Sequence, residues 1–240
     1  MRTAFIIARR EFLTFLAQPV AYVALAVFLV TMGSAFFFLE GFFEANEATM
    51  RNFFEWGPLV FIIYLPALSM RLMAEERRAG TMELLITLPV REIEVVAGKL
   101  LGAVFFLILS LVVTFIYPVM IMNVAQASPD LGMIVGGYIG LLLVGTAYLS
   151  LGVMASSWTH NQIVALIMGA LFCAFFYFVD AMAGAFSTSL EPIMSSVSFR
   201  ARFQNIARGV LDTRDVIFYL GVTAASLSVA AFSLEGRKWR

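Results

Sequence analysis

The residues best suited to chemistry in this chain of 240 residues are charged and gather between residues 71 and 99. The segment reads RLMAEERRAGTMELLITLPVREIEVVAGK, and two carboxylates are followed directly by two guanidinium groups from Glu75 to Arg78. Such a cluster compensates its own charge and offers directional ion pairs to a protein partner. The pattern therefore points to binding chemistry on a loop between two apolar runs.

A short apolar helix is predicted directly after this cluster, between Gly80 and Pro89. Thr81 can cap the helix at its start, and proline ends it because the ring cannot continue the hydrogen-bonding pattern. Leu84 and Leu85 would then project into the cytosol, where an apolar patch should not face water. Docking into a groove of a soluble partner would cover them, and so would folding back onto the membrane surface. The residues alone leave both interpretations open.

Catalysis by this chain is not expected. The single histidine, His160, and the single cysteine, Cys173, cannot form a nucleophile–base pair or a metal site with the spacing they have. The Gly98-Lys99 pair lacks the upstream glycine of a phosphate-binding loop. We therefore expect no enzymatic activity and no bound metal or cofactor.

The composition is that of a membrane protein. Hydrophobic residues make up 61% of the chain and charged residues only 13%, whereas a soluble domain carries about 25% charged residues. So little charge cannot cover a water-facing surface, and the outside must face lipid. The formal net charge is zero, which gives no support for a nucleic-acid partner.

Six apolar runs are long enough, or nearly so, to cross a bilayer, which needs about 20 residues. They cover residues 19–39, 56–70, 100–122, 131–155, 163–179 and 216–234. They predict an all-α membrane protein with one transmembrane domain over residues 1–240. Pro66 and Pro118 should kink their spans, because proline lacks the backbone donor. No ionisable side chain falls in the central part of a run, which argues against a proton-coupled carrier.

The distribution of Lys and Arg predicts the orientation. With the N-terminus inside, eleven of the sixteen basic residues fall in cytoplasmic segments and five fall outside. Positive charge favours the cytoplasmic side. We therefore expect a multi-pass protein of the bacterial inner membrane with both termini in the cytoplasm.

Two segments outside these runs are amphipathic. Residues 3–18 fit a helix lying in the cytoplasmic interface, although a simple topology signal is the alternative. The loop 187–215 holds four arginines on the outer side and an amphipathic stretch, residues 199–211. It is interpreted as a re-entrant or interfacial element between the fifth and sixth spans. A miscounted span, which would place the loop in the cytoplasm, is the alternative.

Glycines at four-residue spacing mark one face of the fourth span. Gly132, Gly136 and Gly140 would let another backbone approach closely, and Gly98 and Gly102 repeat the spacing at the start of the third span. Packing between helices of one chain and packing against a second subunit both fit this pattern.

The segment 70–100 resembles the first cytoplasmic loop of ABC-2 type transporter permeases, where a pattern close to EERRxGTxELLLTLPV precedes the third span. Looser similarity covers residues 8–22, 53–58, 136–152, 160–163 and 207–220. Together these segments look like the gliding-motility-associated branch of that family. Two positions depart from the pattern, since Arg91 stands where serine is usual and His160 where glutamate is usual.

The resemblance implies a permease subunit that couples ATP hydrolysis by a separate ABC ATPase to export or to work on the cell envelope. It implies six spans with an N-terminal interfacial helix and a re-entrant element before the last span. The expected partners are the ATPase, which would bind ATP and Mg, a second copy or a homologous permease, and an auxiliary subunit with an extracytoplasmic domain.

In that family the first loop contains the coupling helix, which packs into the ATPase. The residues expected to couple the two subunits are Glu75, Glu76, Arg77, Arg78, Gly80, Thr81, Glu83, Leu84, Leu85, Thr87, Leu88 and Pro89. The alternative function is a membrane scaffold that recruits a cytosolic partner through residues 71–99 without transport.

Overall fold

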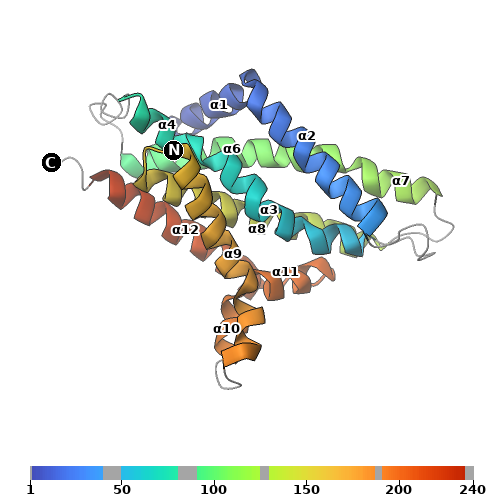
Figure 1. Cartoon of the computed structure of the whole chain (residues 1–240). Coiled ribbons are helices and arrows are strands. Elements are labelled where there is room, and N and C mark those ends of the chain that lie inside the picture. Colours follow the sequence, from blue (N-terminus) through green and yellow to red (C-terminus); the bar gives the residue numbers. More distant parts are fainter. Residues whose placement is uncertain (1, 40–49, 81–90, 125–129, 187–190, 236–240) are drawn as a thin grey trace.

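The computed structural model describes the chain except for residues 1, 40–49, 81–90, 125–129, 187–190 and 236–240, and the secondary structure of the described part is helical (Figure 1). The elements are α1 (Arg2–Ala17), α2 (Pro19–Ser34), the π-helical η1 (Ala35–Leu39), α3 (Arg51–Ser69), α4 (Arg71–Arg78), α6 (Glu92–Thr114), α7 (Ile116–Val124), α8 (Leu131–Trp158), α9 (Gln162–Phe186), α10 (Glu191–Val197), α11 (Phe199–Ala207) and α12 (Thr213–Glu235). The predicted all-α fold is confirmed.

Six helical segments are long and apolar enough to span a membrane, as predicted. They are α2 with η1, α3 with α4, α6 with α7, α8, α9 and α12. The second covers residues 51–78 and the third covers residues 92–123, so both are longer than the apolar runs predicted from the sequence. The difference arises because a helix continues into polar flanks as long as its backbone hydrogen bonds continue, whereas an apolar run ends at the first charges.

The spans α8 and α3 are the most buried, and α2, α9 and α12 have the largest exposed share. Figure 1 shows α1 lying outside the bundle beside α6, and α10 projecting from the opposite side. Large apolar side chains cover the outward faces, among them Val30, Ile217 and Phe232, which are 71%, 68% and 74% exposed. A surface of this kind suits lipid.

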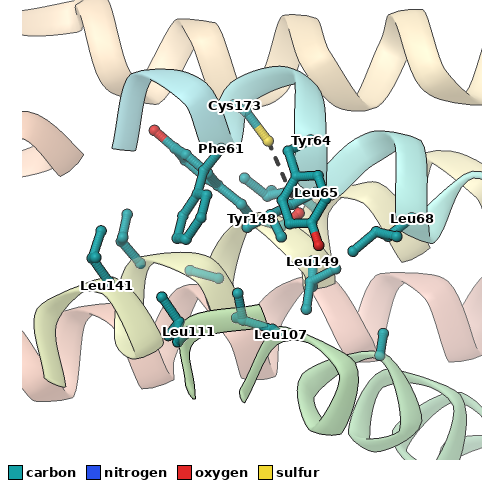
Figure 2. Close-up of a cluster of buried hydrophobic side chains, with 14 of the residues drawn as sticks. Phe61, Tyr64, Leu65, Leu68, Leu107, Leu111, Leu141, Tyr148, Leu149 and Cys173 are labelled. Carbon is teal, nitrogen blue, oxygen red and sulfur yellow. Dashed lines mark hydrogen bonds between the residues drawn. The ribbon is translucent and has the colours of Figure 1, made fainter. Parts of the chain in front are cut away.

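The core lies where α3, α6, α8 and α9 meet, and Figure 2 shows its central side chains. Those labelled are Phe61, Tyr64, Leu65, Leu68, Leu107, Leu111, Leu141, Tyr148, Leu149 and Cys173. The thiol of Cys173 lies 3.9 Å from the carbonyl oxygen of Tyr148. The cysteine therefore fills space between α9 and α8 as a small apolar side chain.

The third span is interrupted at Phe115, between α6 and α7, just before Pro118. Because proline has no N–H, the carbonyl of Thr114 lacks the donor four residues later. The hydroxyl of Tyr138 on α8 donates to this carbonyl at 3.1 Å instead. The break predicted from Pro118 is therefore present, and a neighbouring helix supplies the lost hydrogen bond.

The short helix α11 packs on the glycine face of α8. A Cβ atom added at Gly136 would lie 2.6 Å from the carbonyl oxygen of Ile206, and one at Gly140 would lie 2.9 Å from the ring of Phe203. Such approaches exclude any side chain at these two glycines. In this chain their face is therefore occupied by α11.

Candidate functional site

The helix α1 packs tightly along the first turns of α6. A Cβ atom added at Gly98 would lie 2.8 Å from the carbonyl oxygen of Ala4, and one at Gly102 would lie 2.6 Å from the Cβ atom of Glu11. The small residue Ala8 is fully buried at this contact. Two glycines four residues apart therefore form the groove that receives α1.

Four charged side chains meet beside this groove, and we name Arg10, Glu11, Glu76 and Lys99 the charge cluster. The Lys99 ammonium on α6 lies 3.1 Å from the Glu11 carboxylate of α1 and 2.7 Å from the Glu76 carboxylate of α4. The Arg10 guanidinium lies 2.9 Å from Glu11 and 3.5 Å from Glu76. One lysine thus joins two helices that are far apart in sequence.

Three of the four side chains in the charge cluster are largely buried, which raises the energetic cost of breaking their ion pairs. The Lys99 side chain is 2% exposed, and those of Glu11 and Glu76 are 11% and 18% exposed. A buried charge costs several kcal/mol unless its partners compensate it, so each member depends on the others. The hydrogen bond to Glu11, together with the nearby carboxylate charges, raises the pKa of Arg10. Two cations and two anions leave the cluster neutral.

The helix α4 is also fixed from a second side. Ser156 on α8 accepts hydrogen bonds from the backbone N–H groups of Met73 and Ala74 and donates to the carbonyl of Met70. One hydroxyl therefore satisfies the backbone groups left open where α3 ends and α4 begins. The Arg71 guanidinium donates to the Gln18 side chain at 2.9 Å, which adds a contact to the junction of α1 and α2.

Both ends of the segment 81–90 are held in this way. The helix α4 ends at Arg78, and Gly80 follows with φ of +69°, a conformation that favours glycine. The helix α6 begins at Glu92 after Arg91, which provides no side-chain cap. Acidic residues in the first turn of α6 favour the helix dipole there. The charge cluster joins the helix before the segment, the helix after it, and α1.

Some of the residues proposed for partner binding lie in this region. Glu75 and Arg78 are exposed on α4, Glu76 belongs to the charge cluster, and Arg77 is partly buried. The others lie outside the described residues, and they are Thr81, Glu83, Leu84, Leu85, Thr87, Leu88 and Pro89. The face of Gly132, Gly136 and Gly140 lies on α8 toward α11 and is remote from the charge cluster.

Glu11 and Lys99 as an ion pair were missed by sequence reasoning. The sequence did contain a signal, because the spacing places Glu11 on the same helix face as Ala8 and Phe15. The structure shows that all three are buried. A carboxylate on the apolar face of an amphipathic helix calls for a buried cation. Sequence reasoning considered Lys99 only in the Gly98-Lys99 pair and among the basic residues of the cytoplasmic segments.

We expect Gly102→Leu to lower the free energy of unfolding by about 1–3 kcal/mol, because the new side chain would force α1 away from α6. Denaturant titration in detergent micelles measures the change. Gly221→Leu is the matched control, since no atom lies within 4 Å of a Cβ added there. Equal stability of the two variants would contradict the close packing of α1.

A comparison with known families identifies the family of this chain. A family model described as ABC-2 family transporter protein matches residues 5–237. The match includes most of α1 and both helices that flank the segment 81–90, α4 and α6. No curated protein matches the chain.

Proposed function

Because this chain belongs to the ABC-2 family of transporter proteins, we propose that it couples ATP hydrolysis by a separate ATPase subunit to transport through the loop formed by residues 71–99. Membership makes the chain a permease subunit of an ABC transporter, a membrane component that is generally not catalytic itself. ATP and Mg would be bound by the partner.

The charge cluster is the observation that carries this proposal. A partner pressing on the loop moves α4 and α6, which flank it, and Lys99 joins both to α1 through ion pairs of 2.7 and 3.1 Å. Displacement of any one helix would break at least one of these buried ion pairs, which is costly. The three helices are therefore expected to move together when the ATPase changes shape.

The remaining parts of the proposal follow the resemblance. Two permease copies, or this chain and a homologous permease, would enclose the path, with the termini and residues 71–99 in the cytoplasm of a bacterial inner membrane. The loop 187–215 would form a re-entrant element on the other side. Export, or envelope work of the gliding-motility kind, is the activity we propose, with an auxiliary extracytoplasmic subunit as a further partner.

We expect Leu85→Asp to weaken association with the ATPase by about tenfold or more, since a leucine buried at an interface contributes about 1.5–3 kcal/mol. The protein should still reach the membrane, because the substitution lies in the loop and not in a span. Co-purification from native membranes measures the association, and transport by both subunits reconstituted in vesicles measures coupling. Leu85→Met keeps the volume and apolarity and is the matched control.

The same experiment separates transport from scaffolding. A stoichiometric ATPase that Leu85→Met retains and Leu85→Asp loses would support coupling through this loop. Normal transport by Leu85→Asp would overturn the coupling role of Leu85. A cytosolic partner without nucleotide binding would favour the alternative, a scaffold that recruits through residues 71–99.

A further inference from the structure

A cavity of about 440 Å³ lies at the end of the bundle opposite the charge cluster. It is lined by the first turns of α3, from Arg51 to Leu59, whereas the charge cluster lies beyond the other end of that helix, at Glu76 on α4. With a rise of about 1.5 Å per residue, the two sites are some 25 Å or more apart. The cavity is therefore a second site, separate from the loop that the proposed function uses.

One face of α11 forms a wall of this cavity. The lining residues from this helix and its C-terminal cap follow the spacing i, i+3, i+4, i+7, i+8. They are Arg200, Phe203, Gln204, Ala207 and Arg208. Phe203 is 3% exposed, whereas both arginines are exposed, so the face has an apolar floor and a cationic rim.

The arginines of α11 divide into two groups. Arg202, on the opposite face, pairs with Asp215 at 2.7 Å and covers the ring of Phe218 at 4.2 Å. Arg200 and Arg208 have no carboxylate within ion-pair distance among the residues that the structure describes. The two guanidinium groups beside the cavity are thus available to a ligand, whereas the third holds the helix in place.

The remaining charges leave the cavity positive. Arg51 pairs with Glu55 at 2.9 Å within α3, and Glu55 is the only acidic residue in the described lining. Asp180, near Tyr177 on α9, adds one negative charge close by but does not line the cavity. Among the described residues, the lining carries three arginines against one glutamate. Its floor is aromatic, with Phe54 and Tyr177 buried and Trp56 half-buried.

We infer that this cavity binds an anionic amphiphile, with a phosphate or carboxylate group on Arg200 and Arg208 and an apolar portion on the aromatic floor. Guanidinium groups recognise such anions through paired, charge-assisted hydrogen bonds. The volume falls within the range of about 300–1,000 Å³ that is usual for small-molecule sites. Binding stands on this geometry alone, whereas the role of the ligand as cargo rests on the proposed function.

Trp56 lines the cavity, so its fluorescence can report ligand binding there. The chain has two other tryptophans, which must first be replaced. Trp158→Phe with Trp239→Phe makes Trp56 the sole tryptophan. In dodecyl maltoside micelles we expect dodecyl phosphate to change its emission saturably. Arg200→Gln with Arg208→Gln should weaken apparent affinity by about tenfold or more, since two charge-assisted contacts are lost. No ATPase is needed, so failure here is distinct from failure of the proposed function.

Two controls and a second probe complete the test. Arg214→Gln removes an exposed arginine outside the cavity and should leave the affinity unchanged. Arg200→Lys with Arg208→Lys keeps the charge and should retain part of the affinity. Equal affinity of the glutamine variant and the parent would overturn the inference. Inorganic phosphate that competes as tightly as dodecyl phosphate would also overturn it, because the site would then bind a free anion.

Discussion

Lys99→Met should lower the free energy of unfolding by about 3–5 kcal/mol, which is the usual cost of removing one partner from a buried ion pair. Glu11 and Glu76 would then face each other across α1 and α4 without the ammonium that lies within 3.1 Å of both. Arg10 would compensate only part of the loss, because it lies 2.9 Å from Glu11 but 3.5 Å from Glu76, and its side chain is 61% exposed. Denaturant titration in detergent micelles measures the loss.

Two further variants distinguish charge from packing. Adding Glu11→Gln and Glu76→Gln to Lys99→Met removes the two carboxylates that Lys99 had compensated and should restore most of the stability. Arg91→Met removes an exposed cation at the start of the same helix and should change stability by no more than about 0.5 kcal/mol. If Lys99→Met lowered the free energy of unfolding no more than Arg91→Met does, the charge cluster would not stabilise the fold.

Arg202→Met should cost a comparable amount, about 3–5 kcal/mol, at the other end of the molecule. Asp215 is 4% exposed, and its carboxylate accepts from the Arg202 guanidinium at 2.7 Å. The same guanidinium donates to the carbonyl of Ser196 at 2.7 Å and lies over the ring of Phe218. Its loss would leave a buried carboxylate uncompensated and release α11 from α12. Unfolding in detergent micelles measures the effect.

The matched control for this prediction lies on the same helix. Arg200→Met removes an exposed arginine that lines the cavity and should change stability by no more than about 0.5 kcal/mol. Asp215→Asn in the Arg202→Met background should recover part of the loss, because the buried charge disappears. Equal destabilisation by Arg200→Met and Arg202→Met would show that the ion pair with Asp215 is not what holds α11.

The six spans could be predicted because an apolar run of membrane length has few alternatives to a spanning helix. Helix boundaries could not be predicted, since Arg51, Asn52 and Glu55 and the charged residues among 71–78 interrupt the apolar pattern while the backbone remains helical. The break near Pro118 was foreseeable from the missing donor. Its repair by Tyr138 was not, because that contact depends on how α8 packs against α6.

The charge cluster was only half visible in the sequence. The segment from Glu75 to Arg78 was noticed because four charged residues are consecutive there. Lys99 could not be identified as the partner of Glu76 and Glu11, because it lies 23 residues after Glu76 and 88 residues after Glu11. Pairings at such separations follow from helix packing, which composition does not encode. The glycines at 98 and 102 marked a close contact, and only the structure identifies α1 as the helix that fills it.

The separation of Glu11 and Lys99 has a consequence for biogenesis. Their ion pair joins residues 88 positions apart, and at about 5–20 residues per second the ribosome needs roughly 4–18 s to make the intervening chain. Throughout that interval Glu11 lacks Lys99, and water and the neighbouring Arg10 must compensate its charge instead. The helix α1 can therefore dock against α6 only after the start of the third span has been made, so that it reaches its final position well after its own synthesis.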